Sequence, residues 1–197
     1  MTLTTTRPDY TAARKAMIDS QLRTSGVNDP RTLAAMLQVA REDMVPESRA
    51  AQAYADRAVP LGNGRALPAP LFHGRMLQEA DIRDGERVLV VDSGPGYLAA
   101  LAEAMGGEVT TISPEDAAKR GKGEFDVVLV DGAVEDFPKP LVKRVAEGGR
   151  IFTGTVTRGV TRIAAGRVYG GEVSLLPLAE MGVPVMPEFA AHEEWSF

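Results

Sequence analysis

Cysteine is absent from this sequence of 197 residues. Its absence excludes disulfide bonds, thiolate metal sites and cysteine nucleophiles. Long apolar runs are missing too, since none approaches the roughly 20 residues that span a bilayer. The first residues also lack the apolar core of a signal peptide. We therefore expect a cytoplasmic protein that has no membrane as a partner.

Positive charge is scarce as well. The 22 Lys and Arg residues are outnumbered by 27 Asp and Glu residues, which gives a net charge of -5. Binding to duplex nucleic acid needs a basic face that neutralises phosphates, so we expect no nucleic acid partner. A small basic patch can still exist on an acidic protein. The composition leaves the oligomeric state open.

Strands and helices alternate in the second half of the chain. Short apolar runs predict buried strands at 87–91, 108–112, 125–130 and 150–155. Helical patterns between them, closed by Gly-Gly pairs, predict helices at 98–105 and 141–147. This alternation is typical of a parallel sheet covered by helices. After Gly159, the segments 160–169 and 172–178 predict an antiparallel hairpin.

The first 80 residues have mainly helical patterns. We expect helices from Asp9 to Gly26, from Pro30 onward with Asn28 or Asp29 as the cap, and at 47–54 and 71–79. The segment 59–70 holds three prolines and two glycines and is predicted to be a loop. We interpret 1–80 as a helical cap with a loop region and 81–197 as the α/β core of one compact domain.

A glycine turn links the first of these strands to a helix. The stretch reads VLVVDSGPGYLAA, from Val88 to Ala100. Such a turn lets a ligand approach the backbone, and the helix start presents free N–H groups. One interpretation is a dinucleotide fingerprint, Gly94-x-Gly96-x-x-Ala99. It requires an acidic residue about 20 positions later at a strand end, but Glu115 lies beyond Pro114.

Four blocks, taken in order, resemble the protein-L-isoaspartate O-methyltransferase family. VAREDMVPESRAAQAYAD is similar to the family's Pro-Arg-x-x-Phe-Val-Pro segment, and VPLGNGRALPAP to its Gly-x-Gly-Gln-x-Ile-Ser-x-Pro loop. RVLVVDSGPGYLAALAEAMGGEVTTIS resembles its cofactor motif, Val-Leu-Glu-Ile-Gly-x-Gly-Ser-Gly-Tyr, with the strand that follows. FDVVLVDGAVEDFPKPLVKRVAEGGRIF resembles its Phe-Asp-x-Ile block and Leu-x-x-Gly-Gly-x-Leu.

This resemblance implies a Rossmann-like class I methyltransferase fold with a mostly parallel sheet, an N-terminal helical cap and an antiparallel C-terminal hairpin. It implies methyl transfer from S-adenosylmethionine to the carboxyl group of isomerised aspartyl residues, with a protein or peptide as the substrate. The implied cofactor-binding residues are Asp92, Ser93, Gly94, Gly96, Ser113 and Asp131. The implied substrate-loop residues are Gly64, Arg65, Pro68 and Pro70. No metal site is expected.

Several of these positions depart from the family's pattern. Val90 replaces the family's acid inside the first strand, Asp92 replaces the first glycine of the turn, and Ser113 replaces the acid that holds the ribose. Pro68 and Arg65 stand where the family has serine and glutamine. The segment 114–124 is too short for the family's helix and edge strand, so we expect a sheet that lacks this strand.

These departures predict a degenerate cofactor site. One hypothesis is an active, divergent methyltransferase in which Asp92, Ser113 and Asp131 perform altered versions of the family's tasks. The other is a catalytically inactive relative that acts as a binding or scaffolding module. The sequence leaves open whether Asp92 replaces a lost cofactor contact or blocks the site.

The remaining polar candidates have simpler interpretations. We expect His73 to be a surface or capping histidine and Asp131 to be a turn residue before Gly132, with an Asp92–Asp131 carboxylate pair as the alternative. Arg41 and Glu42 are predicted to hold the N-terminal helices against the core. Near the end of the chain, His192 is expected to bind no metal, and two aromatic residues are expected to pack on the body: Trp195 and Phe197.

Overall fold

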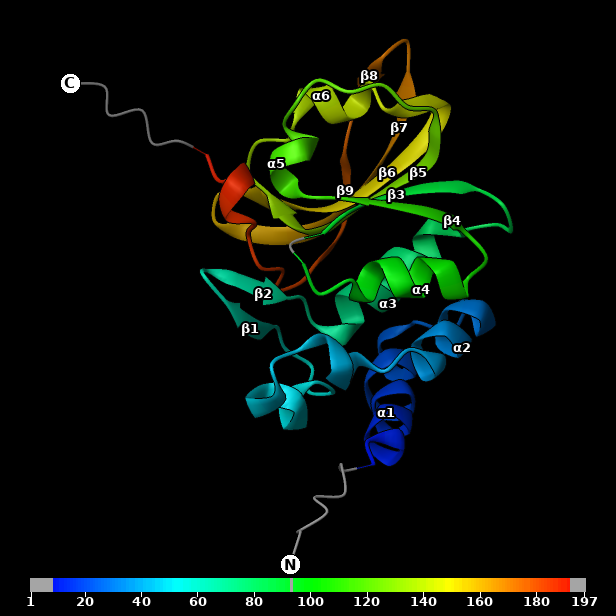
Figure 1. Cartoon of the computed structure of the whole chain (residues 1–197), viewed down its shortest axis with the longest axis vertical. Helices are drawn as coiled ribbons and strands as arrows, with labels where there is room; N and C mark the ends of the chain where they lie inside the picture. Colours follow the sequence, from blue (N-terminus) through cyan, green and yellow to red (C-terminus); the bar gives the residue numbers. More distant parts are fainter. Residues whose placement is uncertain (1–8, 93, 192–197) are drawn as a thin grey trace, which may run out of the picture.

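The computed structural model describes residues 9–92 and 94–191. At its centre is a seven-stranded sheet in the order β4-β3-β5-β6-β7-β8, with β9 paired to β7 (Figure 1). The parallel strands are β3 (Arg87–Val91), β4 (Glu108–Ile112), β5 (Phe125–Val134) and β6 (Val145–Thr157). The antiparallel strands are β7 (Val160–Tyr169), β8 (Glu172–Val173) and β9 (Leu176–Glu180). The expected α/β class and the C-terminal antiparallel pairing are both confirmed.

Side chains of the central strands alternate between two separate cores, because successive residues of a strand point to opposite faces. Val88, Val90 and Leu129 pack with the helices of the N-terminal half, and Leu89 and Val130 pack on the opposite face. Both faces are therefore apolar and covered, as a parallel sheet requires.

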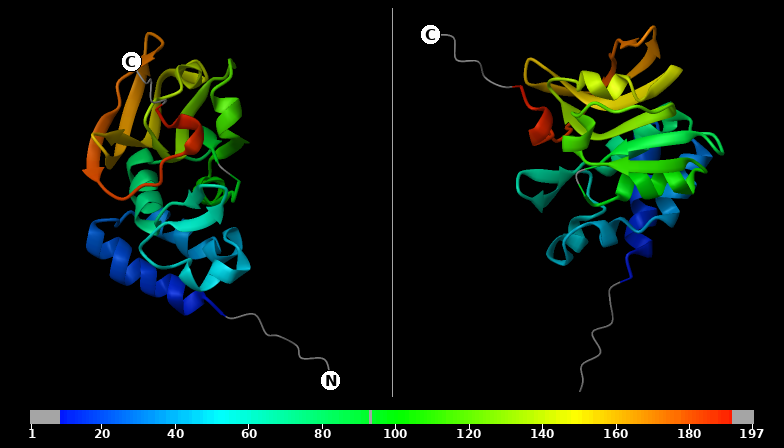
Figure 2. Two further views of the ribbon diagram at one scale, coloured as in Figure 1. Left: turned by 90° about the vertical axis from the view of Figure 1, so that its left-hand side faces the viewer. Right: turned by 45° about the horizontal axis from the view of Figure 1, so that its top comes forward.

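Helices of the N-terminal half cover one face of the sheet (Figure 2). They are α1 (Thr11–Met17) with its continuation to Ser25, α2 (Pro30–Gln38), α3 (Pro70–Ala80) and α4 (Tyr97–Ala104). The Asp29 side chain accepts a hydrogen bond from the Thr32 N–H at 2.7 Å, so the cap predicted for α2 is confirmed. Gly26 ends the first helical segment with φ of 85°, which favours glycine.

Short 3₁₀ helices complete the N-terminal half at Arg41–Met44 and Glu47–Gln52. The second replaces the helix expected at 47–54. On the opposite face of the sheet lie two four-residue helices, α5 (Pro114–Ala117) and α6 (Lys139–Val142). None of the helices within 9–92 and 94–191 has the length and apolar content needed to cross a membrane.

The loop prediction for 59–70 was wrong. This segment contains an antiparallel hairpin, β1 (Val59–Gly62) and β2 (Arg65–Leu67), and Pro70 begins α3. The reason is the Asn63-Gly64 pair, whose φ values of 51° and 74° give the tight turn that joins two strands. The prolines do not prevent pairing in a two-stranded hairpin, where one side of each strand lacks a partner.

The helix predicted at 141–147 was also wrong. α6 ends at Val142, and β6 begins at Val145, five residues before the predicted strand. Phe125 pairs with Val145 in the parallel ladder, so backbone pairing with β5 decides the local structure. β5 itself continues through Asp131 and Gly132 to Val134, so the predicted Asp-Gly turn is absent.

The shortened region after β4 matches its prediction. Between β4 and β5 the chain forms only α5 and a loop. Within the described residues β4 pairs with β3 alone and is therefore an edge of the sheet. Loss of a strand at this position leaves the central strands fully paired, which explains how the fold survives the deletion.

Candidate functional site

Asp92 follows β3 and turns its carboxylate back onto the glycine turn. One oxygen accepts the Gly94 N–H at 2.6 Å and the other accepts the Gly96 N–H at 3.0 Å. Both glycines have positive φ, 133° and 77°, and α4 begins directly after them. The two N–H groups that the sequence assigned to a ligand are therefore bonded to a side chain of the turn itself.

The Asp92 carboxyl group has an unusual acidity. Its side chain is buried, with 5% of the residue exposed. Burial, and then the nearby Asp131 carboxyl group, raise the pKa of Asp92 from 3.8 to about 6, against the opposing effect of the two glycine N–H groups. The predicted carboxylate pair of Asp92 and Asp131 is thus an electrostatic contact inside the protein.

His73 and Asp131 were interpreted wrongly from the sequence. His73 is fully buried on α3, and its Nε2 lies 2.7 Å from an oxygen of Asp131 on β5. His73 occupies one helix face with Met76, Leu77 and Ala80, all of which are buried. This i, i+3, i+4, i+7 pattern was present in the sequence and could have predicted that His73 points inward.

Arg41 fixes the protonation of His73. The Arg41 Nη1 lies 3.2 Å from the His73 Nδ1. A guanidinium only donates, so Nδ1 must accept, and the proton of the neutral ring sits on Nε2, where it is donated to Asp131. Burial lowers the pKa of His73, and the Arg41 charge adds to this effect, although Asp131 opposes both.

Arg41 itself is fully buried. It donates to the Ala53 carbonyl at 2.7 Å and the Pro68 carbonyl at 2.5 Å, and its guanidinium lies 5.0 Å from the centre of the Tyr97 ring. The prediction that Arg41 holds the N-terminal half to the core is confirmed. Pro68 thereby has a structural contact through its carbonyl oxygen, which the loss of a serine hydroxyl does not affect.

Glu42, the next residue, has its partners within the N-terminal cap. It accepts hydrogen bonds from Arg14 at 2.9 Å and from the Tyr54 hydroxyl. Arg14 belongs to α1, so this cluster joins the first helix to the segment before the hairpin. These contacts join parts of the N-terminal cap to one another, so the predicted contact of Glu42 with the core stays a prediction.

A C-terminal segment, 184–189, covers the carboxyl end of β5. The Ala133 N–H donates to the Pro184 carbonyl at 2.8 Å, and the Met186 N–H donates to the Ala133 carbonyl at 2.9 Å. A Cβ at Gly132 would lie 2.5 Å from the Met186 side chain, so glycine permits this close approach. A cavity lined by Arg65, Asp131 and this segment holds only about 10 Å³.

Arg65 joins three elements above the sheet. From β2 it donates to Glu115 at 2.9 Å and also to Glu188. Glu115 lies in α5 and Glu188 in the 3₁₀ turn Pro187–Phe189. We call these three side chains the Arg65 clasp. The clasp ties the hairpin to the two segments that border the carboxyl ends of the strands.

The other predicted site residues have local roles. The Ser113 hydroxyl caps α5 by accepting the Asp116 N–H at 3.2 Å. Pro70 occupies the first turn of α3, and Gly64 forms the hairpin turn near Pro187. The structure therefore brings Asp92, Asp131 and the glycine turn together. Ser113 lies at the end of the neighbouring strand, β4. The remaining positions lie outside the described residues: Ser93, His192, Trp195 and Phe197.

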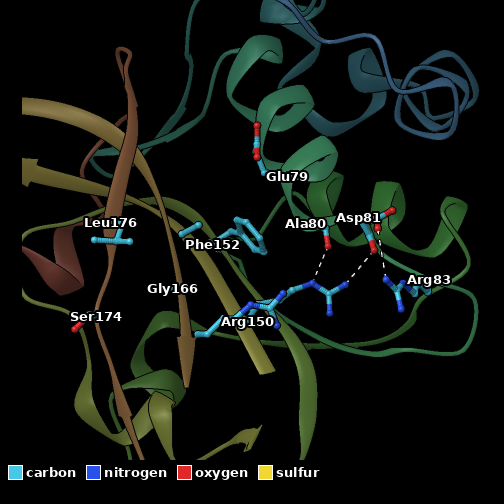
Figure 3. A pocket seen from close by; sticks show the side chains of 11 residues that line it. Glu79, Ala80, Asp81, Arg83, Arg150, Phe152, Gly166, Ser174 and Leu176 are labelled. Carbon is cyan, nitrogen blue, oxygen red and sulfur yellow. Dashed lines mark hydrogen bonds and ion pairs between the residues drawn. The ribbon is translucent and has the colours of Figure 1, made fainter. Parts of the chain in front are cut away.

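Another hollow, of about 680 Å³, lies between the end of α3 and strands β6, β7 and β9 (Figure 3). Arg150 runs along it and donates to the Ala80 and Asp81 carbonyls at 2.8 and 3.0 Å and to Glu86 at 2.7 Å. Arg150 is aligned with the starts of β5 and β3. This hollow is therefore at the opposite end of the sheet from Asp92, and its main cation is already paired.

Comparisons with known proteins address the resemblance directly. Residues 12–120 match the model of the family described as protein-L-isoaspartate(D-aspartate) O-methyltransferase. A protein of that name from Koribacter versatilis is 38% identical over 173 residues, covering 73% of this chain and 78% of its own. One from Aeropyrum pernix is 33% identical over 219 residues, covering 94% and 84%. Because 219 positions exceed this chain's 197 residues, the relative has residues that this chain lacks.

A solved structure supports the fold. It is a putative protein-L-isoaspartate O-methyltransferase from Plasmodium falciparum in complex with S-adenosyl-L-homocysteine. It has a TM-score of 0.72 with 18% identity, and the match covers 92% of this chain and all of that one.

Proposed function

Because this chain belongs to the protein-L-isoaspartate O-methyltransferase family, we propose that it is a protein carboxyl methyltransferase with a weakened cofactor site. Its reaction is the transfer of a methyl group from S-adenosylmethionine to the carboxyl group of isomerised aspartyl residues. The substrate is a protein or peptide. The site lies at the carboxyl ends of β3, β4 and β5, where open α/β sheets bind their ligands.

The main support for a weakened cofactor site is the position of the Asp92 carboxylate. Asp92 occupies the Gly94 and Gly96 N–H groups, and its carboxylate adds negative charge where a ligand would approach. Ser113 is engaged as a helix cap, and Asp131 is bonded to His73. In this arrangement the described residues fit S-adenosylmethionine only weakly, because the donors at the turn are already bonded and a bound ligand must compete with Asp92 for them.

The test is calorimetric titration of S-adenosylmethionine and S-adenosylhomocysteine into wild type and Asp92→Gly. Removal of the carboxylate frees two backbone donors, each worth about 1 kcal/mol net. We expect the variant to bind at least about tenfold tighter than wild type. Asp84→Gly is the matched control, because Asp84 is an exposed turn residue, and it should leave the affinity unchanged. Micromolar binding by wild type would contradict the weakened site.

A second candidate is the inactive relative that acts as a binding module. The Arg65 clasp favours it, because the clasp ties down all three elements that border the site. The discriminating variant is Asp92→Gly combined with Ser113→Glu, which restores the family's residues at both positions. Cofactor binding with methylation of an isoaspartyl peptide supports the methyltransferase. Absence of binding at millimolar ligand in this variant supports the second candidate.

A further inference from the structure

A groove of about 720 Å³ lies between α6 and the loop that follows α5. Four of its six lining residues are cations, and none is acidic: Arg120, Lys122, Lys139 and Lys143. All four are exposed. Within the described part of the chain, no hydrogen bond or ion pair joins any of these four side chains to another residue. We call this surface the basic groove.

The basic groove contrasts with the charge of the rest of the protein. The net charge of the chain is -5, yet four of its five lysines fall between residues 119 and 143. Arginine forms the ion pairs that hold the fold elsewhere, such as Arg14 with Glu42 and Arg150 with Glu86. Lys119 pairs with Asp116, but the three lysines that line the groove have no such partner among the described residues, so ion pairing does not account for their concentration here.

Arg144 holds the loop beside the groove in place. The Arg144 Nη2 donates to the Asp116 carbonyl at 2.8 Å and the Lys119 carbonyl at 3.3 Å. A Cβ at Gly121 would lie 2.3 Å from the Arg144 guanidinium, so the loop sits directly on this fifth cation. The buried Arg144 Nε has no acceptor among the described residues. Arg144 therefore adds positive charge beneath the groove.

Backbone groups of the loop add further donors. Across 9–92 and 94–191, no protein acceptor receives the backbone N–H of Gly121, Lys122 or Gly123. Unbonded backbone N–H groups beside lysine side chains form a typical anion site, as in glycine-containing phosphate loops. Cations and free N–H groups on one short segment point to an anion that has several oxygens.

The composition of the groove selects among anions. Proteins that bind single-stranded nucleic acids provide aromatic side chains on which the bases stack. None of the described residues that line the groove is aromatic. Lysine acts as a mobile point charge, whereas the planar fork of arginine matches a carboxylate in a bidentate way. Three lysines and one arginine in a confined groove therefore suit a compact, multiply charged group better than the spaced carboxylates of an acidic peptide.

From these observations we infer that the basic groove binds a polyphosphate group, either free or as part of a nucleoside triphosphate. Lys122, Lys139 and Lys143 contact the phosphate oxygens, and the N–H groups of the 121–123 loop donate to them. This site lies on the face of the sheet that carries α5 and α6, and its occupancy does not depend on the proposed methyl transfer.

The test is titration of the full chain with inorganic tripolyphosphate at low ionic strength, followed by calorimetry. We expect saturable binding of one tripolyphosphate per chain and weaker binding of orthophosphate. The variant Lys139→Gln with Lys143→Gln should weaken binding about five- to tenfold. The matched control is Lys15→Gln with Arg57→Gln, two exposed cations elsewhere, which should not change the affinity. Unchanged melting temperatures show that the variants fold.

Several results would overturn the inference. One is no binding of tripolyphosphate by wild type, and another is equal weakening in the control variant. Tighter binding of poly-glutamate or of a single-stranded oligonucleotide than of tripolyphosphate would assign the groove to another polyanion. A titration with ATP distinguishes a nucleoside triphosphate from a free phosphate chain as the ligand. Tighter binding of ATP than of tripolyphosphate indicates that the ligand is a nucleoside phosphate. Equal binding indicates that the groove binds the phosphate chain alone. Both results support a phosphate site in the basic groove.

Discussion

The glycine turn after β3 and the 120–123 loop before β5 both combine glycines with backbone N–H groups, but the protein uses them differently. In the first, the Asp92 carboxylate accepts the Gly94 and Gly96 N–H groups. In the second, the N–H groups of Gly121, Lys122 and Gly123 have no protein acceptor within the described residues, and the four cations that line the basic groove have no ion-pair partner there. A glycine-containing loop shows where an anion could bind. Only the local hydrogen bonds show whether its backbone N–H groups are already bonded to the protein.

The largest expected effect on the free energy of unfolding comes from removing Asp131, the buried partner of His73 near the glycine turn. Asp131→Ala removes the acceptor of the His73 Nε2–H and the buried negative charge that offsets Arg41, and loss of one partner of a buried pair costs about 3 to 5 kcal/mol. Urea unfolding measures the loss. Asp136→Ala, an exposed aspartate on the same segment, is the control and should change the free energy of unfolding little. A loss below about 1 kcal/mol would show that the buried His73–Asp131 contact does not stabilise the fold.

The second effect is a pH dependence that only the filled turn has. The pKa of Asp92 in the folded protein is about 6, above its ordinary value of 3.8. The folded state therefore binds the proton more tightly, and the free energy of unfolding falls as the pH rises from about 4 to 6, by about 3 kcal/mol in total.

Asp92→Asn does not titrate, so its stability relative to wild type should rise through this window and stay constant above it. His73 contributes to both proteins and cancels in the difference. Urea unfolding at a series of pH values measures this difference. A constant difference between pH 4 and 8 would contradict the raised pKa of Asp92.

Much of the fold could be predicted from the sequence, but less of the candidate site could be. The bounds of β3 and β4 follow from short apolar runs, and the missing edge strand follows from the length of 114–124. The hairpin follows from Asn63-Gly64, a turn signal that decides the local structure despite the three prolines around it. The Asp92 cap depends on a side-chain conformation, which a pattern does not contain, and His73 meets Asp131 only because tertiary packing brings α3 beside the end of β5.

The third effect concerns the clasp above the turn. Arg65→Ala removes the interactions with Glu115 and Glu188, which are partly exposed and are worth about 1 kcal/mol together. Thermal unfolding should show a small decrease in stability, and proteolysis after the hairpin should become faster. Arg23→Ala removes an exposed helix pair with Asp19 and serves as the control. Equal proteolysis of the two variants would mean that the clasp does not hold the hairpin.

The smallest effect is expected at the open loop. Gly121→Ala places a Cβ 2.3 Å from the Arg144 guanidinium carbon, which is too close, so the loop or the guanidinium must move. Tripolyphosphate binding should weaken about two- to threefold, equivalent to about half a kcal/mol. At Gly182 a Cβ meets no atom within 4 Å, so Gly182→Ala is the control. Equal affinities of Gly121→Ala and wild type would place the anion away from the loop.

Proton–nitrogen correlation spectra of the isotope-labelled chain compare both regions in one sample. On addition of tripolyphosphate, the amide resonances of Gly121 and Gly123 should move, while those of Gly94 and Gly96 stay in place because Asp92 holds them. On lowering the pH without ligand, the Gly94 and Gly96 resonances should shift with a midpoint near 6. Movement of Gly94 and Gly96 with tripolyphosphate, and none at Gly121 and Gly123, would contradict the assignment of a filled turn and an open basic groove.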